Sequence, residues 1–225
     1  MNKAIIVAEI GQNHSGSLET ALKMIQVAKD CGVDFVKFQA RTNNICVPEH
    51  MKSQRKETPW GAMTYLEYRE RLEFSVSQYE SIDTTCQAIG MPWFASVWDI
   101  PSLERMAQFD MPYIKIPSAC LTDHGLIKAA KATGKAVIVS TGMSTTDEID
   151  RSLKLLGRGD IVCHCNSTYP CPNEDLNLSC ITSLLAKWDV VGYSGHEVGL
   201  ATTVAAVVLG AKYIERHLTL NRAYW

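Results

Sequence analysis

The chain has almost no net charge and no long hydrophobic run, and these two absences exclude several classes of protein. Its 22 lysines and arginines nearly balance 24 aspartates and glutamates, for a formal net charge of −2. This balance gives no general attraction to nucleic acid or to a membrane surface. No apolar stretch reaches the roughly 18 residues of a membrane-spanning helix. The start runs straight into a strand pattern, so we expect no secretory signal, a cytoplasmic location and no nucleic-acid or membrane partner.

The eight cysteines show no spacing typical of a disulfide framework. They are scattered over candidate helices, strands and loops, as expected for reduced thiols in a chain of 225 residues. The run Cys163-His164-Cys165 suggests a zinc site, but no second pair of ligands follows at zinc-site spacing. We therefore interpret the cysteines as structural.

Short apolar runs alternate with helix-period segments along the whole chain. The candidate strands are Ala4–Glu9, Phe35–Gln39, Trp93–Ser96, Tyr113–Ile116, Ala136–Ser140, Ile161–Cys165, Val190–Tyr193 and Tyr213–His217. The candidate helices are Leu18–Cys31, Ser75–Ile89, Ser102–Gln108, Gly125–Thr133, Thr145–Leu156, Leu178–Lys187 and Leu200–Leu209. Eight strands joined by crossover helices predict an α/β fold of the (β/α)8 TIM-barrel type.

Three further features qualify this barrel. An open doubly wound sheet is the alternative, but residues 11–16 only loosely match its glycine-rich first turn. The longest connection, residues 40–74, is predicted to be a lid or substrate loop. Only eight residues follow the last strand, so the barrel lacks its final helix here. We expect residues 1–225 to be one catalytic barrel, truncated at its C-terminus, and the natural protein to continue with at least one more helix.

Two histidines follow neighbouring strands at the expected catalytic end of the barrel. His196 and His217 end the seventh and eighth strands, and two imidazoles there can hold a divalent cation. The alternative is two hydrogen-bonded histidines without a metal. Glu9 and Glu215 place carboxylates nearby, either behind a metal or as acceptors for substrate hydroxyls.

Two lysines interrupt strongly apolar strands. Lys37 and Lys115 must each be paired with an anion, because burying a lone ammonium group is costly. The partner is either an internal glutamate or a phosphate or carboxylate ligand. A Schiff-base lysine is a further possibility, since desolvation lowers the pKa of lysine.

Neutral hydrogen-bonding residues follow four other strands. They are Ser118, Ser140-Thr141-Gly142, Asn166-Ser167 and Ser194. Serine is also a common turn residue. Its repetition around one rim, together with two lysines, favours a cradle for a polyanion.

Seven motifs at the strand ends occur in one order and spacing. They are Glu9-Ile10-Gly11-x-Asn13-His14, Val36-Lys37-Phe38-Gln39, Tyr113-x-Lys115-Ile116-x-Ser118, Ser140-Thr141-Gly142-Met143, His164-Cys165-x-Ser167-x-Tyr169-Pro170, Gly192-Tyr193-Ser194-x-His196 and Ile214-Glu215-Arg216-His217. Together they resemble the barrel domain of the sialic acid synthase (N-acetylneuraminate synthase) family. The resemblance implies condensation of phosphoenolpyruvate with an N-acyl-hexosamine, giving a nine-carbon sialic, legionaminic or pseudaminic acid.

The resemblance also implies roles for individual residues. It makes His196 and His217 the ligands of Mn²⁺ or Mg²⁺. The residues that would hold phosphoenolpyruvate are Lys37, Lys115, Ser118, Ser140, Asn166 and Ser194. Those that would face the amino sugar are Glu9, Gln39, Tyr169 and Glu215. We also expect a homodimer.

Three departures from the family pattern affect these expectations. Ala95-Ser96-Val97 replaces a Ser-Thr-Pro sequence, with Ser96 expected to keep the phosphate-binding hydroxyl. Ser118-Ala119-Cys120 replaces Ser-Gly-Glu, so a glutamate that would help water attack is missing. We also expect no antifreeze-like domain, although well-studied relatives carry one. The alternatives are a Schiff-base aldolase using Lys115 or Lys37, and a catalytically impaired barrel serving as a partner subunit.

Overall fold

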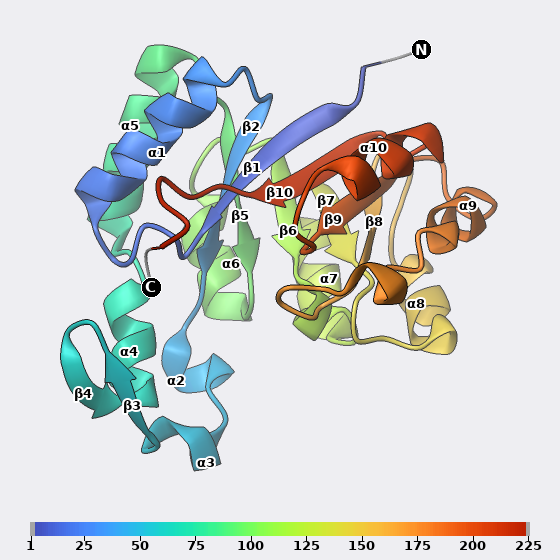
Figure 1. Ribbon diagram of the computed structural model, residues 1–225. Coiled ribbons are helices and arrows are strands. Elements are labelled where there is room, and N and C mark those ends of the chain that lie inside the picture. The colour runs from blue at the N-terminus through green and yellow to red at the C-terminus, as the bar shows by residue number, and fades with distance from the viewer. Residues whose placement is uncertain (1–2, 224–225) are drawn as a thin grey trace.

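Eight parallel strands close into a barrel at the centre of the computed structural model, which describes residues 3–223 (Figure 1). The strands are β1 (Ile5–Gly11), β2 (Phe35–Ala40), β5 (Trp93–Val97), β6 (Tyr113–Ile116), β7 (Ala136–Ser140), β8 (Ile161–Cys165), β9 (Val191–Gly195) and β10 (Tyr213–His217). Their order around the ring is β1-β10-β9-β8-β7-β6-β5-β2. The predicted (β/α)8 barrel is therefore confirmed, and the open sheet is excluded.

The strands are apolar on both faces because the barrel interior and the surrounding helices bury them. In β7, Val137, Ile138 and Val139 are all fully buried. Near-continuous runs of β-branched residues are typical of such parallel strands. The polar residues therefore gather at the strand ends, where the chain leaves the core.

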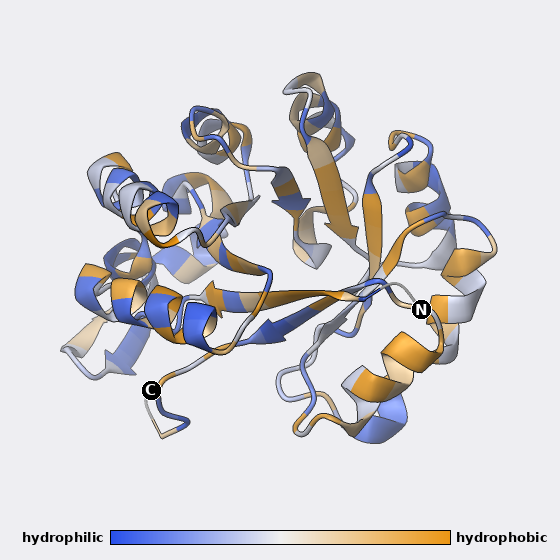
Figure 2. Cartoon of the chain, turned by 90° about the horizontal axis from the view of Figure 1, so that it is seen from above, coloured by the Kyte–Doolittle hydropathy of each residue, from blue (hydrophilic) through white to orange (hydrophobic). Residues whose placement is uncertain are grey.

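Seven helices, one between each two consecutive barrel strands, lie around the outside of the ring of strands (Figure 2). They are α1 (Leu18–Asp30), α5 (Val76–Ile89), α6 (Ile100–Ala107), α7 (His124–Ala132), α8 (Thr146–Leu153), α9 (Ser179–Leu185) and α10 (Ala201–Val208). In α1, Ala21, Met24, Ile25 and Ala28 form one buried stripe at helical spacing. Two 3₁₀ turns, η1 (Ser118–Cys120) and η2 (Asn173–Asp175), follow β6 and β8.

The long connection after β2 has secondary structure of its own. We call residues 41–75 the β2–α5 segment. It contains α2 (Asn43–Cys46), α3 (Glu49–Lys52), the antiparallel strands β3 (Arg55–Thr58) and β4 (Gly61–Thr64), and α4 (Tyr65–Leu72). It lies beyond the carboxyl ends of β2 and β5 (Figure 1). The segment predicted as a lid or substrate loop is therefore a small folded lobe.

The region after β10 contains no helix up to Ala223, within the described part of the chain. Leu218 donates its backbone N–H to the carbonyl of Glu9, and Leu218 and Leu220 pack against the core. All eight cysteines are free thiols. Among residues 3–223, no helix is both long and apolar enough to cross a membrane.

Candidate active site

A cavity of about 160 Å³ opens at the carboxyl ends of the barrel strands. Twelve of the thirteen residues proposed from the sequence line it: Glu9, Lys37, Gln39, Ser96, Lys115, Ser118, Ser140, Tyr169, Ser194, His196, Glu215 and His217. A larger cavity of about 460 Å³ lies next to it, between the loops after β7 and β8. We place the candidate active site in the smaller cavity because the buried charges converge there.

Strand register explains why these side chains converge. Glu9 of β1 is the register partner of Lys37 of β2, and Ser194 of β9 is the partner of Glu215 of β10. Partners on neighbouring parallel strands project their side chains toward the same side of the sheet. One polar residue at the end of each strand is therefore enough to form a ring of polar side chains at this end of the barrel.

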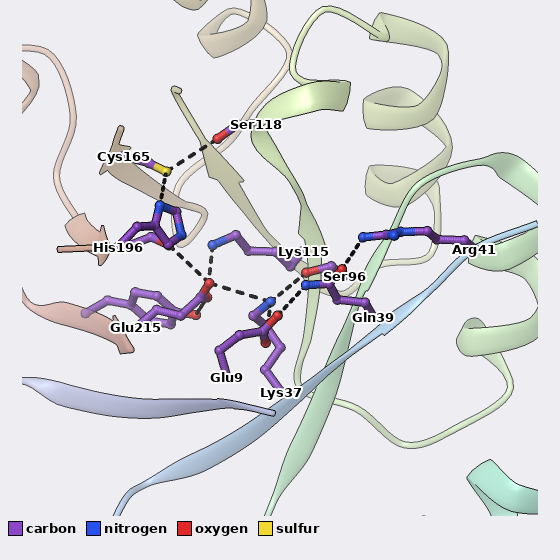
Figure 3. A network of polar contacts seen from close by, with 12 residues as sticks. Glu9, Lys37, Gln39, Arg41, Ser96, Lys115, Ser118, Cys165, His196 and Glu215 are labelled. Carbon is purple, nitrogen blue, oxygen red and sulfur yellow. Dashed lines mark hydrogen bonds and ion pairs between the residues drawn. The ribbon is translucent and has the colours of Figure 1, made fainter. Parts of the chain in front are cut away.

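Four of these residues form an alternating chain of buried charges, Glu9–Lys37–Glu215–Lys115 (Figure 3). The Lys37 ammonium lies 2.7 Å from Glu9 Oε2 and 3.5 Å from Glu215 Oε1. Lys115 Nζ donates to Glu215 Oε2 at 3.0 Å. Every member is buried, so each charge depends on its neighbours for compensation.

Glu215 is the central anion of this chain. Burial alone would raise its pKa, but Lys115 and Lys37 outweigh burial and hold the pKa far below its ordinary value. Tyr213 adds a hydrogen bond from its hydroxyl to Glu215 Oε2 at 2.8 Å. Burial would lower the pKa of Lys115, and Glu215 raises it above the ordinary lysine value instead. Both groups are therefore charged at neutral pH.

Glu9 lies at the other end of the charge chain. Burial raises the pKa of Glu9, although Lys37 opposes this shift. Its Oε1 accepts a hydrogen bond from Gln39 Nε2 at 2.6 Å, and Gln39 Oε1 accepts one from Arg41. Apart from the ion pair with Lys37, Glu9 Oε2 has no hydrogen-bond donor among residues 3–223. Glu9 lines the cavity, and this oxygen keeps a lone pair beside its contact with Lys37.

The two histidines lie side by side at the cavity mouth. The ring centroids of His196 and His217 are 5.6 Å apart, and the ring of Tyr169 lies 4.0 Å from that of His196. Burial lowers the pKa of His196 to about 4. The pKa of His217 is also lowered, and because this residue is exposed we attribute its shift to the positive charge of Lys37 rather than to burial. Both imidazoles are therefore neutral at pH 7.

The donor set of these histidines fits a divalent cation. His196 uses Nδ1 to bond the backbone carbonyl of Asn166 at 2.6 Å, which leaves Nε2 as a free lone pair. A carbonyl that fixes the ring is the usual support of a metal-binding histidine. Within residues 3–223, no group of three or more His, Cys, Asp or Glu side chains is arranged around one metal position. A cation held by these two imidazoles would need its further ligands from a bound molecule.

Hydroxyl groups also line the cavity. Ser118 Oγ lies 3.6 Å from Cys165 Sγ, whose thiol also contacts His196. Gly142 approaches these hydroxyls so closely that a Cβ there would lie 2.8 Å from Ser118 Oγ and would collide with Ser167 Oγ. Glycine is therefore required for the hydroxyls to stay together.

Asn166 is the one proposed side chain that the structure turns away from this cavity. Its Nδ2 donates to the carbonyl of Asp175 and its Oδ1 accepts from the N–H of Thr168. Asn166 lines the neighbouring 460 Å³ cavity. Its contribution to the site is the backbone carbonyl that orients His196.

Ser96 and Cys120, the two residues at which the strand-end motifs depart from the family pattern, lie in different places. Ser96 lies in the cavity and accepts a hydrogen bond from Lys37 at 2.7 Å. Cys120 does not line the cavity, and its thiol donates to the carbonyl of Trp98 at 3.5 Å. Burial raises the pKa of Cys120 to about 11, so it is a neutral thiol. Cys120 therefore has no basic group to offer a water molecule.

Sequence reasoning missed several residues of the site. Trp98, Met143 and Cys165 also line the cavity, and Tyr213 supports it from below. Tyr213 could have been predicted from the sequence, because it lies two residues before Glu215 on the same strand and therefore faces the same side of the sheet. Trp98 and Met143 lie in loops, for which spacing gives no such signal.

Comparison with known proteins identifies one family. Residues 24–225 match the model of the NeuB family. N-acetylneuraminate-9-phosphate synthase of Drosophila melanogaster is 37% identical over 235 residues, covering 99% of this chain and 62% of that protein. N,N'-diacetyllegionaminic acid synthase of Campylobacter jejuni is 31% identical and is covered to 69% of its length. The chain thus spans less than two thirds of the Drosophila relative.

A solved structure shares the same architecture. The N-acetylneuraminic acid (sialic acid) synthetase of Leptospira borgpetersenii superposes with a TM-score of 0.89 at 30% identity. The match covers 98% of this chain and 75% of that one. The barrel and its strand order are therefore those of a solved relative.

Proposed function

The chain belongs to the NeuB family, and from this premise we propose that it condenses phosphoenolpyruvate with an N-acyl-hexosamine. The observation that carries the proposal is the buried chain Glu9–Lys37–Glu215–Lys115 at the carboxyl ends of the strands. The described barrel would act as one catalytic unit. The product is a nine-carbon acid of the sialic, legionaminic or pseudaminic type, with phosphate as the second product.

The two lysines are the proposed anchors for phosphoenolpyruvate. Lys37 and Lys115 present ammonium groups on one wall, and the hydroxyls of Ser118, Ser140 and Ser194 lie on the same cavity surface. Hydrogen bonds between charged groups and phosphate oxygens are about twice as strong as neutral ones. Glu215 contacts both ammonium groups and so positions them before the substrate arrives.

The opposite end of the charge chain suits the acceptor sugar. Glu9 Oε2 can accept a hydrogen bond from a sugar hydroxyl, and Gln39 fixes the carboxylate through Oε1. The exposed ring of Tyr169 offers an apolar face beside His196. In the reaction, C3 of phosphoenolpyruvate bonds to the aldehyde carbon of the open-chain sugar, water adds at C2, and the C2 oxygen expels phosphate.

His196 and His217 are the proposed ligands for Mn²⁺ or Mg²⁺. When bound there, the cation supplies Lewis-acid polarisation of the aldehyde oxygen. The chain's own part is to keep both imidazoles neutral and to orient His196 through the Asn166 carbonyl. In a manganese titration by calorimetry, His217→Ala should weaken binding at least about tenfold. An unchanged affinity, with exposed His50→Ala as the control, would remove the two-histidine site.

The Schiff-base alternative needs a neutral lysine. Lys115 instead has a pKa above the ordinary value because Glu215 stabilises its charge. A protonated amine does not attack a carbonyl. The geometry therefore favours an anion-binding lysine over a nucleophile.

A screen of acceptor sugars tests the proposal. The chain would be given phosphoenolpyruvate, manganese and one sugar at a time: N-acetylmannosamine, its 6-phosphate, or a di-N-acetylated dideoxy-hexose. We expect phosphate release that requires both the sugar and the metal. Release without sugar, or a borohydride-trapped sugar adduct without phosphoenolpyruvate, would contradict it.

A further inference from the structure

A cavity of about 500 Å³ lies beside the candidate active site, between the β2–α5 segment and the barrel mouth. Trp98 and Tyr169 line both cavities, so the two are neighbours across shared side chains. Two arginines, Arg41 and Arg69, form part of its wall. We call it the arginine cavity.

Arg69 is a buried cation without a carboxylate partner. Only 9% of this residue is exposed, and its one side-chain hydrogen bond to residues 3–223 runs from Nη1 to Gln12 Oε1 at 2.8 Å. No Asp or Glu oxygen in the described part of the chain lies within 4.0 Å of it. Its helix α4 begins with a Thr64–Glu67 capping box, which fixes the helix end.

Arg41 is the second arginine of this cavity, and it is partly exposed. Its guanidinium group lies 3.8 Å from the centre of the Trp98 ring and donates to Gln39 Oε1. Its Nε is buried without an acceptor among residues 3–223. The nearby Glu73 carboxylate is engaged by the backbone N–H of Arg41 at 3.1 Å and forms no ion pair with the guanidinium within 4.0 Å.

Buried cations without an internal counter-ion are costly unless a ligand supplies the charge. Arginine is suited to this because its planar fork binds phosphate or carboxylate through two parallel hydrogen bonds. We propose that the arginine cavity binds an anionic group, such as a phosphate monoester, carried on the far end of the acceptor sugar. This inference rests on the proposed function, which places the sugar in the adjoining cavity.

A continuous set of contacts joins the two cavities. Arg41 donates to Gln39, and Gln39 donates to Glu9, the proposed acceptor for a sugar hydroxyl (Figure 3). A sugar held at Glu9 would therefore extend toward Arg41 and Arg69. The arginine cavity thus selects an anionic acceptor over a neutral one.

The test compares two acceptors that differ only in charge, N-acetylmannosamine and its 6-phosphate. We expect the natural chain to have the higher kcat/KM for the 6-phosphate. Arg69→Met should reduce that preference at least about tenfold, mainly through the KM for the phosphorylated sugar. Arg71→Met is the matched control, since it removes an exposed arginine from the same helix and should keep the preference. Equal losses with both acceptors, or a natural preference for the neutral sugar, would overturn the proposal.

Calorimetric binding separates this inference from the proposed function. If no sugar supports phosphate release, the proposed function fails, but the 6-phosphate should still bind the natural chain and bind Arg69→Met weakly. No binding to the natural chain would overturn the inference. If inorganic phosphate binds as tightly as the sugar phosphate, the anionic group is not recognised as part of the sugar. The cavity would then be a site for free phosphate. If thermal melting shows that Arg69→Met does not fold, Arg69→Lys should bind the 6-phosphate more weakly than the natural chain, and unchanged binding would count against the proposal.

Discussion

Lys115 is the residue whose charge is most completely enclosed by the site. Its side chain is 2% exposed and its ammonium contacts Glu215. Lys115→Met leaves that carboxylate and any bound anion poorly compensated, so the KM for phosphoenolpyruvate should rise and kcat should fall. We expect a loss in kcat/KM worth about 1.5–3 kcal/mol, as for a hydrogen bond to a charged group.

The control for Lys115 is Lys187→Met, which removes a lysine from a surface ion pair with Asp150. Surface pairs contribute little, so this variant should keep its kinetics. Steady-state kinetics of both variants gives the comparison. A covalent substrate adduct isolated on Lys115 would instead support the aldolase chemistry.

Glu73 gives a prediction about pH. Burial raises the pKa of Glu73 from 4.5 to about 7, and Arg41 only partly offsets this. Between these two values the unfolded chain has lost a proton that the folded chain retains, so stability falls as pH rises through this window. Glu73→Gln keeps an acceptor for the Arg41 N–H but cannot ionise, so the stability of this variant should decrease less as pH rises.

At pH 8 the Glu73→Gln variant should be more stable than the natural chain, by at most about 3 kcal/mol for a shift of this size. Denaturant unfolding at pH 5 and pH 8 measures the difference. The exposed Glu80→Gln serves as the comparison. If both variants follow the pH profile of the natural chain, Glu73 is ionised in the folded state at pH 5.

At the scale of elements, the turn after β1 depends on a glycine that touches α4. Gly16 has φ +75°, and a Cβ there would run into the carbonyl oxygen of Arg71. Gly32 has nearly the same φ, +73°, with nothing within 4 Å. Substituting alanine at each of these two glycines therefore distinguishes the cost of a positive φ from the cost of steric crowding.

Gly32→Ala should lower the free energy of unfolding by about 1 kcal/mol, the usual strain of a positive φ. Gly16→Ala should lose at least about 1 kcal/mol more, because backbone atoms must also move apart. Chemical denaturation of both variants checks this. An equal decrease in the free energy of unfolding for both variants would mean that the turn after β1 is not tightly packed against α4.

The elements that the sequence predicted are those with strong apolar periodicity. The strands Tyr113–Ile116, Ala136–Ser140, Ile161–Cys165 and Tyr213–His217 were predicted to the residue. The β2–α5 segment was predicted only as a loop, because its four-residue elements, such as Arg55–Thr58, and its mostly polar helix α4 have too few apolar positions to show a period.

The candidate site divides in the same way. Side chains at strand ends could be placed from the sequence because period-two alternation fixes which face they occupy. Asn166 lies beyond its strand, and its amide is captured by the local backbone groups of Asp175 and Thr168. The arginine cavity could not be predicted, since Arg41 and Arg69 meet only through the folding of the β2–α5 segment.

For the whole molecule, α10 and the loop that precedes it carry several exposed apolar side chains. Val198, Leu200, Val204 and Val208 are between 62% and 81% exposed. Clustered apolar side chains of this kind are typical of interaction surfaces. We expect this face to pair two copies of the chain, giving a homodimer whose population rises with concentration.

Light scattering across a concentration series measures this association. A double variant, Val204→Lys with Val208→Lys, should shift the chain toward the monomer by placing like charges on the paired face. Ile45→Lys changes another exposed apolar residue, on the β2–α5 segment, and should leave association unchanged. Dimers that persist in the double variant would place the interface elsewhere.

The closed ring of strands determines how folded copies can meet. Every barrel strand has a hydrogen-bonded neighbour on both sides, so the ring offers no open edge for strand addition by another chain. The hairpin of β3 and β4 does have open edges, but each strand has only four residues, and β3 reads Arg-Lys-Glu-Thr. Short, charged edges are poor templates for cross-β stacking. Aggregation of the amyloid kind would therefore require the barrel to open first, so it should follow the unfolding rate of the chain.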